Sequence, residues 1–175
     1  GVVQKDCLPK TACLRLDKET GSFAVPLSTD THSTDGYNPT LGVVDEYHQA
    51  KDDTILNALK SGMIQQDNGI LAIISTAGFN LNSPFKKEWD YASDILKRKY
   101  INDRYFAVMY CLDNKDEVMN QDMWIKANPL MSNPKIARTM KEQIQNDLDV
   151  AVKQSNLNNV LVKNMNMFVQ QNEAS

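Results

Sequence analysis

The sequence lacks long hydrophobic runs, a cysteine framework and an excess of positive charge. No apolar stretch approaches the roughly 18 residues that a bilayer-spanning helix needs, so none is expected. The three cysteines, Cys7, Cys13 and Cys111, match neither zinc-site nor disulfide spacings, and with only two histidines a structural metal site is not expected. The net charge of −3 gives no basic footprint for nucleic acid. These absences are typical of a cytosolic protein with reduced thiols.

A phosphate-binding loop is missing as well. The pattern G-x-x-x-x-G-K-[ST] occurs nowhere in the 175 residues, and the nearest fragment, "LKSGM" at 59–63, lacks the glycine spacing. Without that loop, no nest of backbone N–H groups cradles a β-phosphate and no loop lysine meets it. The chain by itself therefore has no complete nucleotide pocket of the P-loop type.

The composition that is present, 42% hydrophobic and 23% charged, suits a globular domain with a core of its own. Apolar runs predict strands at 22–28, 40–45, 70–75 and 104–113, and helical spacing predicts helices at 52–63, 83–100, 120–131 and 133–155. The runs at 40–45 and 70–75 are continuous, which is typical of strands buried on both faces. Strands that alternate with helices predict an α/β fold with a largely parallel sheet, flanking helices and a C-terminal helical segment.

Polar clusters follow two of the predicted strands. Asp45 and Glu46 end the strand at 40–45, and Ser75 and Thr76 end the strand at 70–75. In open α/β sheets, ligands lie beyond the carboxyl ends of the strands. An aspartate there can hold a hydrated Mg²⁺, and an adjacent glutamate can polarise a water for attack on a γ-phosphate. The hydroxyls could bond the phosphate or the water. Acidic strand ends are also common simply because they meet solvent, and both interpretations stay open at this point.

The motifs "DG-x-NP", "VVDE-x-H" and "ISTAG", within residues 35–79, resemble the ATPase of tailed-phage terminase large subunits, the motors that pump DNA into capsids. The resemblance implies that Asp45 is the Walker B metal ligand, holding Mg²⁺ through water, and that Glu46 is the catalytic glutamate. It further implies that a coupling motif links hydrolysis to movement; its residues are Ser75, Thr76, Ala77 and Gly78. Mg²⁺ and ATP are then the cofactors of the parent protein, and we expect the fragment to bind neither.

The resemblance also implies a domain organisation. Residues 1–114 are expected to form a partial P-loop ATPase core without the P-loop strand, and residues 115–175 a helical segment that leads toward a missing nuclease domain. The family's nuclease carries clustered metal-binding acids, and the chain after Val160 has only Glu173, so that domain is expected to be absent. The absent strand would lie between the strands at 70–75 and 104–113, so we expect these two to pair directly or to leave edges that another copy covers. We predict a fragment that is inactive alone.

The partners that the resemblance implies are DNA, the portal protein, the small terminase subunit and neighbouring copies. No membrane is expected, and the location would be the cytoplasm of the bacterial host. Two alternatives remain: a non-catalytic prophage remnant or interaction module, and an unrelated flavodoxin-like α/β protein. His48 is interpreted as an ordinary loop residue, and Trp89 and Trp124 as core or interface residues.

Overall fold

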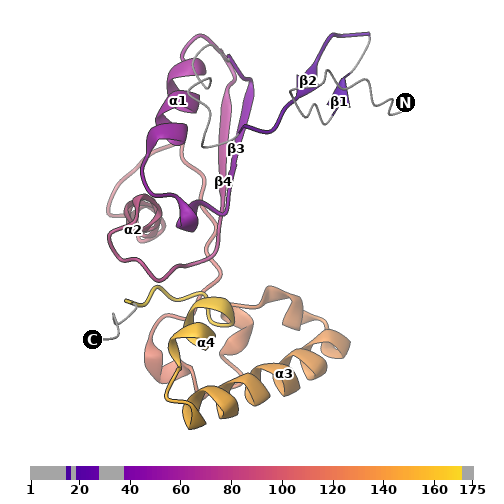
Figure 1. The fold of residues 1–175 in the computed structure, drawn as a ribbon, viewed down its shortest axis with the longest axis vertical. Coiled ribbons are helices and arrows are strands. Elements are labelled where there is room, and N and C mark those ends of the chain that lie inside the picture. Colours follow the sequence, from indigo (N-terminus) through magenta and orange to yellow (C-terminus); the bar gives the residue numbers. More distant parts are fainter. Residues whose placement is uncertain (1–14, 17–18, 28–37, 171–175) are drawn as a thin grey trace. The chain divides into compact units, whose positions relative to one another are not determined.

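The computed structural model describes residues 15–16, 19–27 and 38–170 of the chain (Figure 1). It divides into two compact units, one formed within 1–42 and 54–70 and the other within 43–53 and 71–175. Among the helices in these ranges, none combines the length and the hydropathy of a membrane span. Cys7, Cys13 and the first residues of the "DG-x-NP" motif lie outside the described ranges.

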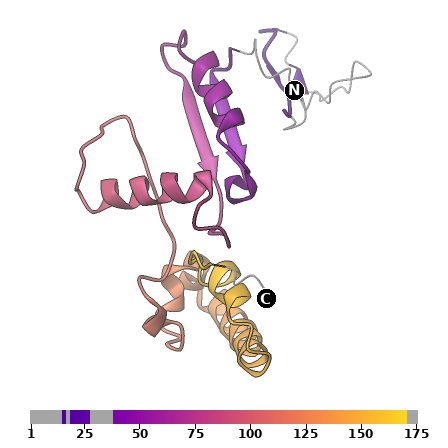
Figure 2. The same ribbon diagram turned by 60° about the vertical axis from the view of Figure 1, so that its left-hand side comes forward.

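Two pairs of strands form. Strands β1, Arg15–Leu16, and β2, Phe23–Ala24, pair antiparallel with Leu16 opposite Phe23; β2 lies within the strand predicted at 22–28, and β1 was not predicted. Strands β3, Leu41–Asp45, and β4, Ile70–Ile74, form a parallel two-stranded sheet and lie side by side in both views (Figures 1 and 2). The fold is therefore mixed α/β with a small parallel sheet, which confirms the predicted class in its coarse form.

The prediction that these two strands are buried on both faces is wrong. The side chains of Leu41, Val43, Ile70 and Ile74 are all more than half exposed. No further strand pairs with β3 or β4 in the described part of the chain. A parallel strand is buried on both faces only when other strands and helices cover it, and in this two-stranded sheet these side chains remain open to solvent.

The prediction of a strand at 104–113 is also wrong. These residues have no regular secondary structure, and they do not pair with β4. Their burial nevertheless alternates: Phe106, Val108 and Tyr110 are at least half exposed, while the residues between them are partly buried. The apolar run predicted a strand, but a strand also needs a hydrogen-bonded neighbour, which the sequence pattern cannot supply.

The first two helices begin and end close to the predicted positions. Helix α1, Thr54–Gly62, buries Leu56 and Leu59. Helix α2, Pro84–Leu96, begins after Ser83, whose hydroxyl accepts a hydrogen bond from the backbone N–H of Lys86 at 3.2 Å. Ser at the N-cap followed by Pro in the first turn is a strong start signal, because the Ser hydroxyl accepts from an unpaired N–H of that turn and Pro has no N–H that would need a partner.

The C-terminal half is helical. A short helix broken at Pro129 was predicted at 120–131. The break is present, and the two pieces are 3₁₀ turns, η3, Trp124–Lys126, and η4, Pro129–Ser132. Helix α3, Pro134–Lys153, confirms the predicted long helix, and α4, Asn158–Lys163, follows it. Shorter 3₁₀ turns are η1, Tyr47–Gln49, and η2, Lys115–Glu117.

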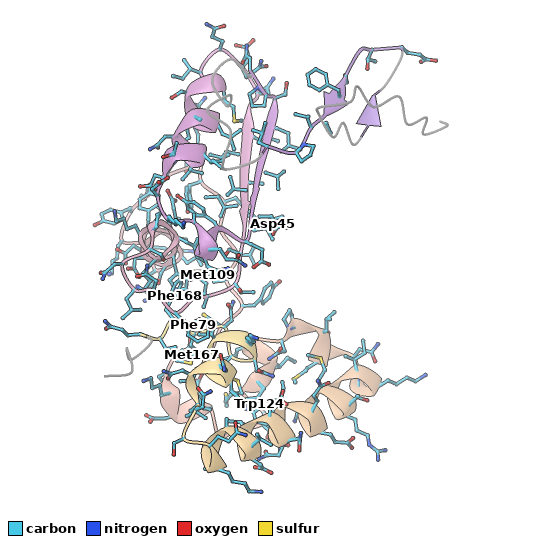
Figure 3. The ribbon with its side chains drawn as sticks, viewed as in Figure 1. Asp45, Phe79, Met109, Trp124, Met167 and Phe168 are labelled. Atoms are coloured by element: carbon cyan, nitrogen blue, oxygen red, sulfur yellow. The ribbon has the colours of Figure 1, made fainter. Side chains whose placement is uncertain are left out.

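A hydrophobic core lies among these helices, with Trp124 fully buried within it (Figure 3). The indole N–H of Trp124 donates to the carbonyl oxygen of Val118 at 2.8 Å, so burial of the ring leaves no unpaired polar group. The interpretation of Trp124 as a core residue is confirmed. The buried members of the core are Leu112, Val118, Trp124, Met131, Ile144, Leu148, Ala151, Val160, Leu161, Val162, Met165 and Val169.

Candidate functional site

The carboxyl end of β3 presents two exposed carboxylates. Glu46 has left-handed backbone geometry (φ 52°), which turns the chain sharply from β3 into η1. Its N–H donates to the carbonyl oxygen of Ile74 on β4 and to Oδ1 of Asp45, both at 2.9 Å. The turn is thus held to the neighbouring strand, and the Asp45 side chain is held to the turn. Asp45 (Figure 3) and Glu46 are both exposed, so both are accessible to a ligand.

His48 connects this turn to the end of β4. Its backbone N–H donates to Oγ of Ser75 at 3.0 Å, and its ring Nδ1 lies 3.1 Å from the same oxygen. Nδ1 also lies 3.4 Å from Oε2 of Glu46. The two polar strand ends that the sequence pointed to are therefore brought together, with His48 between Glu46 and Ser75.

This cluster is not a serine–histidine–acid catalytic triad. In such a triad one ring nitrogen takes the nucleophile's proton while the other is held by the acid. Here Ser75 and Glu46 both approach Nδ1 of His48, and the Ser75 hydroxyl donates to the carbonyl oxygen of Thr76 at 3.1 Å. The geometry suits a link between two backbone segments and does not suit acyl transfer.

The loop that follows β4 is tightly packed. Ala77 and Gly78 are buried, whereas Thr76 is exposed. A Cβ atom on Gly78 would come within 3.2 Å of Cβ of His48 and 3.6 Å of a ring carbon of Phe168. Glycine therefore lets the loop, the η1 turn and Phe168 approach this closely without displacing His48.

Residues from the C-terminal end of the described chain hold this loop. The N–H of Ala77 donates to Oδ1 of Asn166 at 2.6 Å, and the N–H of Val169 donates to the carbonyl oxygen of Gly78 at 3.4 Å. The side-chain amide of Asn166 also donates to the carbonyl oxygen of Tyr110 at 2.7 Å. The loop at 75–78 is thus bonded to η1 on one side and to 166–169 on the other.

An aromatic cluster supports the same region. Phe85 on α2 lies with its ring centroid 5.9 Å from Tyr47 and 5.8 Å from Phe168, and Trp89 lies 5.3 Å from Phe168. The Tyr47 hydroxyl donates to Oδ1 of Asp53 at 2.7 Å. Burial of the phenol, followed by the bond to Asp53, raises the pKa of Tyr47 well above its usual value. Tyr47 therefore acts as a neutral packing and anchoring residue.

The acidic strand end fits a loosely held divalent cation. No group of three or more His, Cys, Asp or Glu side chains capable of holding a metal occurs in the described ranges. Mg²⁺, however, keeps several waters and is commonly bound by one or two carboxylates together with substrate phosphates. The exposed carboxylates of Asp45 and Glu46 meet that need, and they could not hold a metal tightly on their own.

Sequence reasoning placed the residues at both strand ends but missed those that connect them. His48 was taken as an ordinary loop residue, although its spacing from Glu46 places it on the turn beside Ser75. Asn166 and Phe168 gave no signal in the sequence, because they act through tertiary contacts with residues some 90 positions away. The left-handed turn at Glu46 was not anticipated either.

Two family models match the chain in succession. The terminase large subunit ATPase domain matches residues 14–94, and the terminase large subunit endonuclease domain matches residues 99–175. The expectation that the nuclease domain is absent is therefore wrong, and part of it is present. That expectation relied on a missing cluster of metal-binding acids, whereas this part of the domain is a helical core around Trp124.

Relatives point to the same family. The chain is 27% identical over 116 residues to the terminase large subunits of Lactococcus phages p2 and SK1, covering 66% of this chain and 21% of theirs. It is 30% identical over 95 residues to protein YmfN of Escherichia coli strain K12, covering 54% of this chain and 21% of that protein.

A solved structure shares the fold. The crystal structure of the HK97 bacteriophage large terminase superposes with a TM-score of 0.59 at 22% identity, over 81% of this chain and 28% of that one. The chain spans about a fifth of the length of its curated relatives. From the two consecutive domain matches and these relatives, the chain belongs to the terminase large subunit family, as a short piece that carries ATPase-domain sequence followed by endonuclease-domain sequence.

Proposed function

We propose that this chain is part of a DNA-packaging motor that hydrolyses ATP to move DNA into a capsid, and that its β3 and β4 strand ends form one half of the nucleotide site. In this proposal the chain is a partial P-loop ATPase fold that lacks the P-loop strand, with a helical segment beginning after residue 114. The exposed apolar side chains on β3 and β4 support it, because strands of a parallel sheet are covered by further strands and helices when the sheet is complete.

The roles proposed for the site follow from its chemistry. Asp45 would hold Mg²⁺ through water, and Glu46 would orient and polarise the attacking water. Bound Mg²⁺ supplies charge neutralisation at the phosphates. Ser75, Thr76, Ala77 and Gly78 would form the loop that couples hydrolysis to movement. The observation that carries the proposal is the contact of His48 with both Glu46 and Ser75, because it joins the base to that loop.

The parent protein would use Mg²⁺ and ATP in the cytoplasm of the bacterial host. Its partners would be DNA, the portal protein, the small terminase subunit and neighbouring copies. The chain alone would bind no nucleotide appreciably, because it has no phosphate-binding loop in its sequence. It could self-associate through its open sheet edges, since unpaired strand edges invite pairing with another chain.

The test is phosphate release by the intact terminase large subunit that contains this chain. Glu46→Gln should lower the Mg²⁺-dependent kcat by about 10²–10⁴, the usual contribution of a positioned general base. Glu142→Gln, the same change at an exposed α3 residue that pairs with Arg138 on the surface, should leave turnover unchanged. Full turnover in the Glu46→Gln protein would refute the assignment of the base.

A second candidate function is a non-catalytic interaction module that uses the α/β layer to bind a partner. The missing phosphate-binding loop favours it for the chain in isolation. The phosphate-release measurement separates the two. If the intact protein carrying wild-type residues hydrolyses no ATP with Mg²⁺ present, the interaction module is the better account.

A further inference from the structure

We propose that Asn166 is a positioning residue that fixes the loop at 75–78 to the endonuclease-matching half of the chain. The inference rests on the proposed function, because that function gives the loop its role in hydrolysis. Neither Asn166 nor any other residue beyond 99 has a part in the nucleotide site as proposed above. The inference therefore adds a contact between the two family-matched segments, 14–94 and 99–175.

One side-chain amide bonds two separate backbone segments here. Its oxygen accepts from the N–H of Ala77 at 2.6 Å, and its nitrogen donates to the carbonyl oxygen of Tyr110 at 2.7 Å. Ala77 is fully buried, so this N–H cannot exchange its partner for water without a movement of the loop. An amide is the side-chain group of this size that supplies both an acceptor and a donor, which makes Asn specific for the position.

The backbone that presents this amide is itself firmly held. Asn166 is in the left-handed region (φ 51°), which Asn tolerates better than most residues. Met165, directly before it, is fully buried, and its carbonyl oxygen accepts from the N–H of Leu112 at 3.2 Å. The N–H of Met167, directly after it, donates to the carbonyl oxygen of Leu161 on α4 at 2.9 Å. The amide is thus fixed to α4 and to the hydrophobic core.

These contacts form an unbroken chain from α4 to the proposed base. Helix α4 fixes Asn166, Asn166 holds the N–H of Ala77, and the same loop carries Ser75, whose hydroxyl contacts His48. His48 in turn lies against Glu46. A movement of α4 would therefore displace the loop through these hydrogen bonds, and a movement of the loop would displace α4.

The experiment compares three variants of the intact protein. Asn166→Gly keeps the left-handed backbone without strain and removes both hydrogen bonds. Asn166→Asp keeps an acceptor for Ala77 but places an oxygen against the Tyr110 carbonyl. Asn159→Ala removes an exposed amide on α4, for which the structure shows no hydrogen bond to the loop, and serves as the matched control.

Two measurements are made on each variant. Hydrogen exchange of the Ala77 amide should be about tenfold faster in Asn166→Gly, the factor that corresponds to a hydrogen bond of ordinary strength, and near wild type in Asn166→Asp and Asn159→Ala. The kcat for ATP should fall about tenfold in Asn166→Gly with KM little changed, because the loop acts after ATP is bound. A merely structural role would not separate kcat from KM in this way.

The outcomes are distinguishable from a failure of the proposed function. Ala77 exchange in Asn166→Gly that stays within about twofold of wild type overturns the inference, whatever the ATPase does. A kcat that is unchanged in Asn166→Gly, in a protein whose turnover Glu46→Gln abolishes, also overturns it.

If Glu46→Gln leaves turnover intact, the proposed function fails, and the exchange measurement still decides whether Asn166 holds the loop. If Asn166→Gly does not fold, Asn166→Asp decides, because retained Ala77 protection is then required.

Discussion

Replacement of Trp124 by Phe tests whether the helical half is held by one specific buried side chain. Trp124 is fully buried, and its indole N–H is the donor to the carbonyl oxygen of Val118 at 2.8 Å. Phe retains an aromatic ring but removes the donor and part of the volume. The Val118 carbonyl would then lose this partner, and a void would remain in the core that also contains Leu148 and Met165.

The expected loss follows from these two effects. A buried carbonyl that loses its donor costs about 1–3 kcal/mol, and a partial void in a close-packed core adds about 1 kcal/mol. Together they predict that the free energy of unfolding of Trp124→Phe falls by about 2–4 kcal/mol. Trp124→Ala should be less stable than Trp124→Phe, because full removal of a buried aromatic side chain costs about 3–5 kcal/mol. Losses of this size are a large part of the stability of a typical domain.

The assay is urea unfolding followed by far-UV circular dichroism, which reports mainly on α2 and α3. With a slope near 2 kcal/mol/M, the predicted loss shifts the midpoint by about 1–2 M at unchanged slope. Trp89→Phe is the matched control, because Trp89 is only partly buried and its ring contacts with Phe85 and Phe168 are kept by another aromatic ring. A midpoint in Trp124→Phe that falls no further than in Trp89→Phe would refute the reasoning.

Two further predictions follow from the geometry around the candidate site. Burial, and then the charge of Glu88, raise the pKa of Tyr105 to about 12. The unfolded chain therefore loses this proton at a lower pH than the folded chain does. The free energy of unfolding should then fall as the pH rises from 10 to 12. Urea midpoints across that range should fall less steeply in Tyr105→Phe, and an equal fall would contradict the cause. Gly78→Ala should cost about 1–3 kcal/mol, because in this buried loop its Cβ would lie 3.2 Å from Cβ of His48. At the exposed Gly69 a Cβ would lie 3.0 Å from the flexible Cε of Met63 and 3.3 Å from Cβ of Gln66; because this turn is at the surface and can adjust, Gly69→Ala should cost less than about 1 kcal/mol. Thermal unfolding of the two variants compares them, and equal Tm values would contradict the packing argument.

Local signals in the sequence were sufficient wherever a residue acts on its near neighbours. Ser83 and Pro84 fixed the start of α2, because an N-cap hydroxyl and a first-turn proline act within one turn. The spacing of Ile144, Leu148 and their neighbours fixed α3, and the apolar runs fixed β3 and β4. The polar residues that follow those strands also predicted that Asp45, Glu46 and Ser75 lie near one another, because the carboxyl ends of neighbouring parallel strands lie at the same edge of the sheet.

The family resemblance recognised in the motifs between 35 and 79 is confirmed, but the absence of the nuclease domain was inferred wrongly. That inference relied on clustered acids, which hold the metal ions of a nuclease site. The segment that matches the endonuclease model, 99–175, is instead defined here by packing around Trp124 and by the turn that begins at Asn128 and Pro129. Packing residues of this kind carry no motif that can be read without the fold.

The sequence by itself determined helices α1, α2 and α3, the segments of β3 and β4 and the residue types that follow those strands, because these depend on residues close together in the chain. Only the tertiary structure decided whether a segment became a strand, as the unpaired residues 104–113 illustrate, since a strand requires hydrogen bonds from a neighbour. It also decided that His48 and Asn166 join the loop at 75–78 to its surroundings. Those contacts span from 27 to 89 positions along the chain, and no local preference encodes them.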